Sequence, residues 1–330
     1  MICYAASVTN RFDVLGLGLN SQDQIISLGM FPAPGEKVRY TRAVPTPGGQ
    51  VAVACVVCQR HGLRSRYAGC VGDDAAGTRQ YQTLAAEGVE LSALRVVPET
   101  ASQQAAIFLE ASGERTIVFE RSAALVYPPE AVSPAWIASG TWLLVDGYDA
   151  AAAAQAAQLA RVAGTRVLAD LSFFQPGDRE PVESLLRHTD DLICSQRFPE
   201  SFLGVRCPLD ALPMLRTQYG LARATITLGR DGVLGLDAEG WHYSPAFVVR
   251  ETDTTGAGDV FHGGFLVAQQ RAACFSESLT FAAALAALNC TERGARGHIA
   301  TGHEVATFLS GAARHPTPDW LRHLALAQRS

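Results

Sequence analysis

Residues 253–259 read Asp-Thr-Thr-Gly-Ala-Gly-Asp, and the chain continues Val-Phe-His-Gly-Gly-Phe. The first two residues of this heptad are types that cap the start of a helix. The small residues that follow let several backbone N–H groups gather around one anion. They are Gly256, Ala257 and Gly258, and Asp259 then lies in the first helical turn. Phosphoryl transfer to an alcohol needs this arrangement, because the amides hold the charge that builds up between the phosphates and the carboxylate takes the hydroxyl proton.

The composition of the chain indicates a globular protein and excludes several mechanisms. The sequence has 330 residues, of which 48 % are hydrophobic, enough for one large α/β domain or two ordinary ones. The net charge of −5 argues against a general nucleic-acid binder. Lys37 is the only lysine, so the chain has no Gly-Lys-Ser/Thr phosphate loop. Phosphates would therefore be bound by backbone amides, metal and arginine.

The cysteines and the N-terminus do not indicate a secreted protein. Cys55 and Cys58 form a C-x-x-C pair inside the apolar run 51–57, so we interpret them as core thiols rather than a redox or zinc pair. The first ten residues lack the basic start and long apolar run of a signal peptide. No window of about eighteen apolar residues is present. We therefore expect a cytoplasmic protein with no membrane partner.

Short apolar runs of strand length alternate with helix-like runs, which is the pattern of a parallel sheet covered by helices. We expect strands at residues 12–17, 66–70, 142–145, 167–171, 192–194 and 224–228. We expect helices at residues 49–60, 75–87, 150–163 and 275–290. The fold class that follows is α/β, with a doubly wound, mostly parallel sheet and helices on both faces. We expect residues 1–330 to form a single domain.

Two segments, 24–46 and 102–121, break this alternation. The first surrounds the turn at 31–35 and the second the turn at 111–114, and both patterns predict β-hairpins. Together they would form a small lid that excludes water, which a kinase needs in order not to hydrolyse ATP. Two surface hairpins without that role are the alternative. Residues 314–330 are interpreted as a linker and a terminal helix. Exposed apolar lid residues would suit a homodimer through the lid; we expect them to be Ile25, Leu28 and Phe31.

Two carboxylates are expected at the carboxyl ends of strands, where doubly wound sheets bind ligands. Asp23 follows a strand and the turn 16–18, and an ionised carboxylate accepts vicinal hydroxyls well. Asp146 ends the strand at 142–145 and is followed by Gly147. Each has a structural alternative, a hairpin start for Asp23 and a loop cap for Asp146. A sugar role for Asp23, and a sugar or metal role for Asp146, are therefore hypotheses.

Over roughly residues 12–310 the chain resembles the ribokinase-like (PfkB-type) carbohydrate kinases. The resemblance rests on motifs that occur in the family's order. They are Gly16-Leu-Gly18 with Asp23, Gly48-Gly49-Gln50, Gly69-Cys-Val-Gly-Asp73-Asp-Ala-Ala-Gly77, Thr227-Leu-Gly229-Arg-Asp-Gly232 and the heptad 253–259. The resemblance implies a doubly wound domain with a β-lid and transfer of a phosphoryl group from Mg²⁺-ATP to a sugar hydroxyl.

The resemblance also implies roles for individual residues. Asp259 would be the catalytic base, with the three small residues before it as the anion hole. The sugar side would be formed by Asp23, Gly48, Gly49, Gln50, Asp146 and Arg115. The nucleotide side would be formed by Ser195, Thr227, Gly229, Gly232 and Asn289. Family members often bind a monovalent cation beside the anion hole, and a potassium site is a hypothesis at Asp253, Thr255 and Gly294.

Three positions depart from the common family pattern. Val53 stands where an asparagine usually binds the sugar, which should change selectivity. The family's Asn-x-x-Glu reads Ser195-Gln-Arg-Phe198, so metal assistance would be reorganised. Arg115 lies on the expected lid, as in ketohexokinase-type enzymes, and the segments at 253–264 and 289–294 look like sulfofructose kinase. A lid arginine suits an anionic substituent or the transferring phosphate; a solvated hairpin charge is the alternative.

Three functions are left open by the sequence. The first is an ATP-dependent kinase acting on a ketose, a pentose or a sulfofructose-like sugar derivative. The second is a nucleoside kinase of the same fold, with Phe108, Phe119 and Tyr148 as candidates to hold the base. The third is a catalytically retired sugar- or nucleotide-binding protein, which Val53 and Phe198 favour and the intact heptad opposes.

Overall fold

A computed structural model gives the structure of the protein and describes residues 11–111, 115–172, 174 and 176–321. The tip of the predicted turn at 112–114, the first ten residues and the end of the predicted terminal helix at 322–330 lie outside the described residues. No helix in the described part of the chain combines the length and the apolar character needed to span a membrane.

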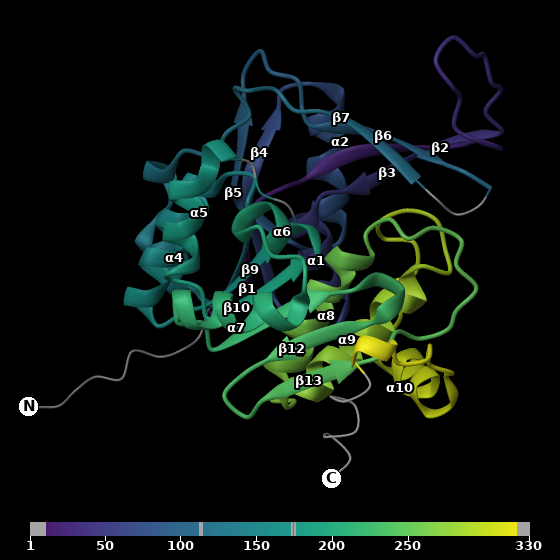
Figure 1. The fold of residues 1–330 in the computed structure, drawn as a ribbon. Helices are drawn as coiled ribbons and strands as arrows, with labels where there is room; N and C mark the ends of the chain where they lie inside the picture. The colour runs from purple at the N-terminus through teal and green to yellow at the C-terminus, as the bar shows by residue number, and fades with distance from the viewer. Residues whose placement is uncertain (1–10, 112–114, 173, 175, 322–330) are drawn as a thin grey trace, which may run out of the picture.

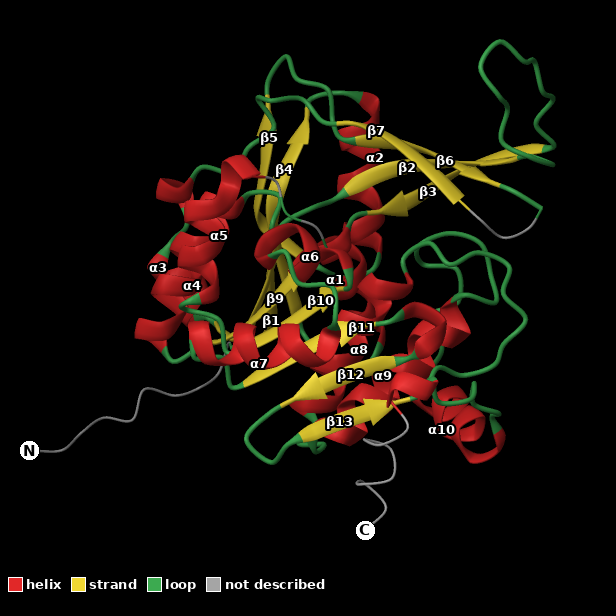
Figure 2. Cartoon of the chain, in the orientation of Figure 1, coloured by secondary structure: helices red, strands yellow, loops and turns green. Residues whose placement is uncertain are grey.

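A large central sheet forms the body of the molecule (Figures 1 and 2). From one edge to the other its described strands are β13 (Trp241–Ser244), β12 (Val233–Leu236), β11 (Arg223–Thr227), β10 (Asp191–Ser195), β9 (Arg166–Leu171), β8 (Gly140–Asp146), β1 (Phe12–Leu17), β4 (Ser65–Gly72) and β5 (Glu90–Val97). The strands from β5 to β11 pair in parallel, and β12 and β13 pair antiparallel at one edge. The prediction of a mostly parallel sheet is confirmed.

Helices cover both faces of this sheet. One face packs against α1 (Gln50–Arg60), α2 (Ala75–Ala86), α8 (Ala257–Gln270) and α9 (Phe275–Asn289), with α10 (Gly302–Gly311) resting on α9. The other face packs against α3 (Pro134–Ala138), α4 (Ala150–Ala163), α5 (Arg179–Leu186), α6 (Arg197–Leu203) and α7 (Pro208–Tyr219). Single 3₁₀ turns complete the described elements: η1 (Pro129–Ala131), η2 (Pro176–Asp178), η3 (Gly229–Asp231) and η4 (Asp319–Leu321).

The central strands are apolar on both sides because both sides are covered. In β8, Leu143 and Val145 pack among the residues of the α4 face, whereas Trp142 and Leu144 pack on the α8 face. Successive side chains of a strand point to opposite faces, so such a strand reads as one continuous apolar run. This is why the sequence predicts these strands by apolar run length rather than by alternation.

The order of the strands places a topological switch point at β1. From β1 the chain winds outward through β4 and β5, then returns to β8 on the other side of β1 and continues to β11. At such a point the connections leave the sheet in opposite directions and open a crevice at the carboxyl ends of the strands. The fold therefore directs ligand binding to the ends of β1, β8, β9, β10 and β11.

A second, smaller sheet projects from this edge (Figure 2). It has the order β3 (Arg42–Gly48), β2 (Ser21–Ser27), β6 (Gln104–Leu109) and β7 (Arg115–Glu120). The two predicted hairpins are the antiparallel pairs β2–β3 and β6–β7, and they join through the parallel pair β2–β6. We call this sheet the lid.

Two expectations about exposed segments need correction. Ile25 and Leu28 are buried rather than exposed, because the lid has a small apolar core in which Ile25 packs with Ile107 and Leu109. Phe31 is exposed as expected. The start of the predicted C-terminal linker is tied to the body of the molecule, since Arg314 pairs with Phe247 in a β-bridge.

Candidate active site

The small-residue heptad ends one strand-to-helix connection and begins α8, as the sequence predicts. Gly256 is the N-cap of α8 with φ 75°, and a Cβ atom there would lie 2.4 Å from the Cα of Ala295. Only glycine fits this close approach in the left-handed region. Gly258 is exposed, and a Cβ atom there would meet nothing within 4 Å. The Ala257 N–H group donates to the Thr254 carbonyl oxygen at 3.3 Å, whereas Gly258 faces open space at the start of the helix. Open space beside the first turn of a helix is the arrangement that binds anions.

Asp253 joins the heptad to the loop that follows α9. One of its carboxylate oxygens accepts a hydrogen bond from the Thr255 N–H at 2.9 Å, and the other accepts from the Gly294 N–H at 2.9 Å. Asn289 is fully buried behind the same loops, where its amide group lies 3.4 Å from the carbonyl oxygens of Thr255 and Ala295. This position gives Asn289 a supporting role for the loops; its predicted contact with a nucleotide stays a prediction.

Asp23 and the glycines of the sugar motif lie together where the lid meets the body. Ser21 donates a hydrogen bond to Asp23 at 2.7 Å, and burial raises the pKa of Asp23 to about 6. A Cβ atom on Gly48 would lie 2.0 Å from the Asp23 carboxylate, so this close approach requires glycine. Gly49 is the N-cap of α1. The carboxylate is therefore fixed at the foot of the lid, beside the start of α1.

Asp146 holds backbone in place. Its two carboxylate oxygens accept hydrogen bonds from the N–H groups of Leu19, at 2.7 Å, and Tyr148, at 3.0 Å. Its side chain is buried, and burial raises its pKa to about 7. Of the two alternatives that the sequence leaves open, this geometry fits the loop cap, because both oxygens bind the connections that leave β1 and β8.

Two site residues were not found by sequence reasoning, Asp170 and His262. Asp170 lies at the carboxyl end of β9, and its oxygens are 3.3 Å from the Gln50 amide nitrogen and 3.4 Å from His262 Nε2. Gln50, which the sequence places on the sugar side, also donates to the Ser172 hydroxyl at 2.8 Å. Both missed residues carry a signal, since Asp170 ends an apolar strand as Asp146 does and His262 follows Asp259 by one helical turn.

Asp259 lies among these carboxylates. Its side chain is half-buried in the first turn of α8, and burial, together with the charge of Asp170, raises its pKa to about 7. Asp23 and Asp146 raise it further, while His262 opposes them. A carboxylate whose pKa lies near neutral pH is a better proton acceptor than an ordinary aspartate, so Asp259 is suited to act as a general base.

Arg115 brings positive charge to the anion loop from the lid. It is the first residue of β7, and its guanidinium donates a hydrogen bond to the hydroxyl of Thr254, within the heptad. The lid therefore touches the loop that begins α8. A guanidinium in this place is suited to pair with a phosphate oxygen.

The residues predicted for the nucleotide lie at the ends of β10 and β11. Thr227 ends β11 with its hydroxyl 3.4 Å from the Cys194 carbonyl, and Ser195 ends β10 with its hydroxyl 2.5 Å from the Ser172 carbonyl. Gly229 and Gly232 flank the η3 turn that follows β11. These residues share the carboxyl edge of the sheet with Asp170, as the predicted nucleotide site requires.

The two family positions that differ in this chain face the core. Val53 is fully buried on α1 among Val57, Val260 and Ala295. Phe198 is fully buried and stacks on Phe202 with ring centroids 5.0 Å apart. Neither side chain offers a polar group to the site, because both are enclosed in the apolar core.

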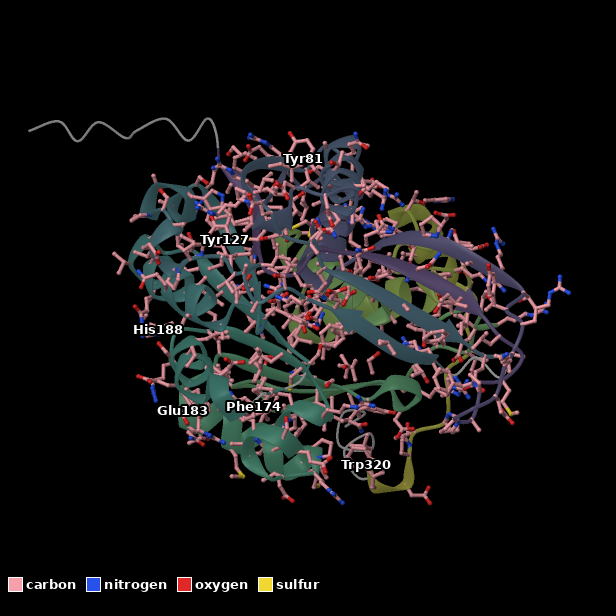
Figure 3. All side chains as sticks on the ribbon, turned by 90° about the horizontal axis from the view of Figure 1, so that it is seen from above. Tyr81, Tyr127, Phe174, Glu183, His188 and Trp320 are labelled. Atoms are coloured by element: carbon pink, nitrogen blue, oxygen red, sulfur yellow. The ribbon has the colours of Figure 1, made fainter. Side chains whose placement is uncertain are left out.

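A cavity of about 440 Å³ adjoins the site on the side of Gln50 and Asp170. Four aromatic side chains line it, together with Arg121 and Asp149, which form an ion pair at 2.8 Å. The aromatic residues are Phe119, Tyr127, Tyr148 and Phe174. In Figure 3, Tyr127 and Phe174 lie on the same side of the molecule as Glu183, on α5, and His188, which follows α5. The volume is within the roughly 300–1,000 Å³ of small-molecule sites.

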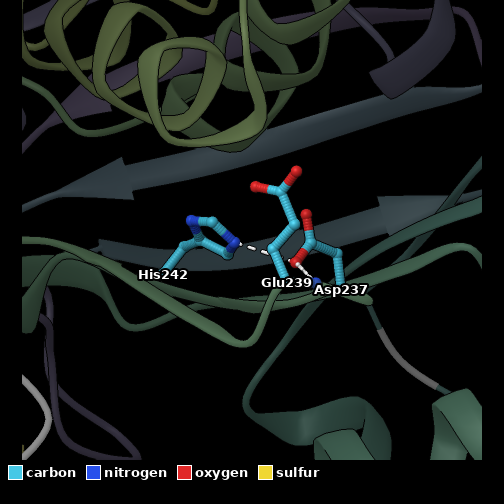
Figure 4. A group of neighbouring side chains, drawn as sticks. All are labelled: Asp237, Glu239 and His242. Atoms are coloured by element: carbon cyan, nitrogen blue, oxygen red, sulfur yellow. Dashed lines mark hydrogen bonds and ion pairs between the residues drawn. The ribbon is translucent and has the colours of Figure 1, made fainter. Parts of the chain in front are cut away.

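A separate group of potential metal ligands lies at the β12–β13 turn (Figure 4). Asp237, Glu239 and His242 offer ligand atoms within 4.8 Å of one another. One oxygen of Asp237 accepts hydrogen bonds from His242 Nε2, at 2.9 Å, and from the Glu239 and Gly240 N–H groups. These hydrogen bonds account for the cluster as a tight turn.

Known proteins resemble this chain in sequence and in fold. The model of the pfkB family of carbohydrate kinases matches residues 21–301. A ribokinase of Haemophilus influenzae is 29 % identical over 305 residues, 90 % of this chain and 98 % of the relative. An aminoimidazole riboside kinase of Salmonella typhimurium is 32 % identical over 286 residues, 80 % of this chain and 88 % of the relative.

Solved structures agree with the central sheet and the lid. The structure of a putative ribokinase from Agrobacterium tumefaciens superimposes with a TM-score of 0.84 at 27 % identity, covering 91 % of this chain and 98 % of the other. A putative ribokinase II from E. coli, solved in complex with ATP and Mg²⁺, has a TM-score of 0.78 at 23 % identity and covers 91 % and 99 %. The fold and site thus define a carbohydrate kinase, and the chain belongs to the pfkB family.

Proposed function

We propose that the protein transfers the γ-phosphoryl group of ATP to a hydroxyl group of a sugar or sugar derivative, with Asp259 as the base. The observation that carries the proposal is the position of Asp259. It stands in the first turn of α8, beside the open cradle at Gly258 and among the carboxylates of the sugar side. This position supports the proposal because anion binding and proton removal would then take place within one helical turn.

The free N–H groups at the start of α8 would hold the charge that develops as the γ-phosphoryl group leaves ATP. Asp259 would accept the proton of the attacking hydroxyl, and its raised pKa favours that step near neutral pH. Arg115 would add positive charge from the lid, where it already bonds to Thr254. Bound Mg²⁺ would neutralise the phosphate oxygens. Ser195, Thr227, Gly229 and Gly232 would lie along the nucleotide.

On the sugar side, Asp23 and Gln50 would bind hydroxyl groups. Asp23 is held by Ser21 and is pressed against Gly48. Gln50 reaches from the start of α1 towards Asp170 and Ser172. The acceptor hydroxyl would then lie between these groups and Asp259, with the lid excluding water from it.

A monovalent cation such as K⁺ fits the loops that Asp253 joins. The hydroxyl oxygen of Thr255 is buried and has no hydrogen-bond partner in the described part of the chain. The backbone N–H group of the same residue binds the Asp253 carboxylate, and hard cations prefer hydroxyl and carboxylate oxygen ligands. Turnover that is the same in potassium and in a bulky organic cation would remove this assignment.

A nucleoside kinase is the second candidate, because four aromatic side chains line the adjoining cavity. Aromatic rings bind the flat faces of bases by stacking. The aminoimidazole riboside kinase among the relatives acts, by its name, on a riboside. A substrate with an aromatic substituent on its sugar would place the ring among Phe119, Tyr148 and Phe174.

The test is the release of ADP from Mg²⁺-ATP across a panel of ketoses, pentoses, sulfofructose, 2-keto-3-deoxy acids and nucleosides, with and without potassium. Asp259→Asn is the matched control, because it keeps the shape of the side chain and removes the base. One strong, Asp259-dependent activity is the expected result. ATP binding with no turnover on any acceptor would instead support a retired binding protein.

The lid also supports a homodimer. Its last strand presents three exposed apolar residues, Ile117, Val118 and Phe119. Ile117 and Phe119 lie on one face of this strand and Val118 on the other, and exposed apolar side chains at a sheet edge favour pairing with a second copy. A monomeric mass in solution at micromolar concentration would refute this part of the proposal.

A further inference from the structure

Asp170 and His262 form a buried polar pair between the sugar side and the anion loop. Their side chains are 2 % and 4 % exposed. Asp170 comes from β9, and His262 comes from α8, one turn after Asp259. Neither residue contacts the sugar or the nucleotide in the proposed phosphoryl transfer.

The hydrogen bonds of His262 determine how many protons the pair carries. Its Nδ1 atom lies 2.6 Å from the Gly258 carbonyl oxygen, so Nδ1 must carry a hydrogen. Its Nε2 atom lies 3.4 Å from both the Asp170 carboxylate and the Ile193 carbonyl oxygen, which are acceptors. A neutral ring with its hydrogen on Nδ1 would turn a lone pair towards an ionised carboxylate. One further proton, on Nε2 or on Asp170, removes that conflict.

We propose that Asp170 and His262 are a positioning pair that shares one proton, and that this shared proton holds the first turn of α8, with Asp259, in its working position. The bond from His262 to the Gly258 carbonyl fixes the turn itself. The bond from Gln50 to Asp170 connects the pair to the sugar side. The part that concerns Asp259 rests on the proposed function, whereas the shared proton does not.

The surroundings of the pair agree with a shared proton. Burial raises the pKa of Asp170 to about 7 and lowers the pKa of His262, so burial favours the uncharged form of each group, as a proton held between them requires. The titratable groups that face the pair and Asp259 are Asp23 on β2, Asp146 at the end of β8, Tyr148 in the loop after it and Cys194 on β10. While the proton is shared the pair is neutral. When Asp170 is ionised without a proton partner, its charge raises the pKa of Asp259.

Nitrogen NMR of the His262 ring in the full-length protein tests the shared proton directly and needs no activity. The expected spectrum shows a hydrogen on Nδ1 and a change at Nε2 as the pH passes through about 7. Asp170→Asn should abolish that change. A ring that carries its hydrogen on Nε2 alone, or a transition that survives in Asp170→Asn, would overturn the proposal.

The pH profile of kcat tests the link to Asp259. In His262→Gln the amide donates to Asp170 and keeps it ionised, so the acid limb should move to higher pH. In Asp170→Asn the charge is absent, so the limb should move to lower pH. The two limbs should differ by about one pH unit. His61→Gln is the matched control, since His61 is a buried histidine that caps the far end of α1, and its profile should equal that of the parent.

A purely structural role would lower kcat in both site variants without separating their acid limbs, and that result would overturn the link to Asp259. If no acceptor on the panel is phosphorylated, the proposed function fails while the NMR result still decides the shared proton. The two failures are therefore distinguishable.

Discussion

Substitutions at two glycines of the heptad should have different effects: a change at Gly256 should lower stability, and a change at Gly258 should lower activity. At Gly256 an added methyl group would lie 2.4 Å from the Ala295 Cα and 2.5 Å from its carbonyl oxygen. These are backbone atoms and cannot rotate away. The φ of 75° adds a second cost, because alanine in the left-handed region loses about 1–2 kcal/mol. Overpacking of this kind costs about 1–3 kcal/mol.

Gly256→Ala should therefore lower the free energy of unfolding by roughly 2–5 kcal/mol. Gly258→Ala should not, since its methyl group meets nothing within 4 Å and alanine favours a helix more than glycine does. That methyl group would instead occupy the space beside the anion-binding N–H groups. Loss of one such interaction costs about 10²–10³ in kcat.

Urea denaturation and steady-state ADP release, measured on both variants and the parent, check this pair of expectations. The reasoning is refuted if Gly258→Ala retains parental kcat, because the open space would then not hold the transferred phosphate. It is equally refuted if Gly256→Ala unfolds at the same urea concentration as the parent, because the Ala295 backbone would then have room to move.

Three further predictions concern charged groups of the site. First, kcat/KM should fall about tenfold per pH unit below pH 6, because Asp259 must be ionised to act and its pKa is about 7; a flat profile between pH 5 and 8 would contradict this. Second, Arg115→Gln should lower kcat about ten- to hundredfold with little change in KM for a neutral sugar, because the guanidinium would pair with the transferring phosphate. If KM rises only for anionic sugars and kcat does not change, Arg115 binds the substrate instead. Third, Asp253→Asn would turn an amide N–H group towards the N–H group of Gly294 or Thr255, so one hydrogen bond is lost. The free energy of unfolding, measured by urea denaturation, should fall by about 1–3 kcal/mol. An unchanged midpoint would show that other contacts hold the loops.

The sequence predicted six strands of the central sheet and the helices α1, α2, α4, α8 and α9, because their apolar runs are long and have clear ends, whereas α3, α5, α6, α7 and α10 were not predicted. The helix at 150–163 was predicted with its observed bounds, since it is rich in alanine and Gly164 ends it in the left-handed conformation. The strands β5, β12 and β13 were missed. β5 and β13 are the two edge strands, and β5 carries exposed residues such as Val96, so neither a continuous apolar run nor a strict alternation marks them. β12 is apolar but only four residues long, with Gly235 inside it, which is too short a run to predict a strand.

The chemistry proposed for the site could be predicted from the heptad, since its small residues, helix start and carboxylate are consecutive in the sequence. Asp170, His262 and the contact between Arg115 and Thr254 were decided only by the tertiary structure. These groups come from β9, from α8 and from the lid. A local sequence pattern does not predict which strand ends and which helix faces will contact one another in the folded protein. The burial that raises the pKa of Asp259 has the same origin. The pKa of a group depends on its burial and on the charges around it. For Asp259 these charges belong to residues far apart in the sequence, which come together only in the folded protein.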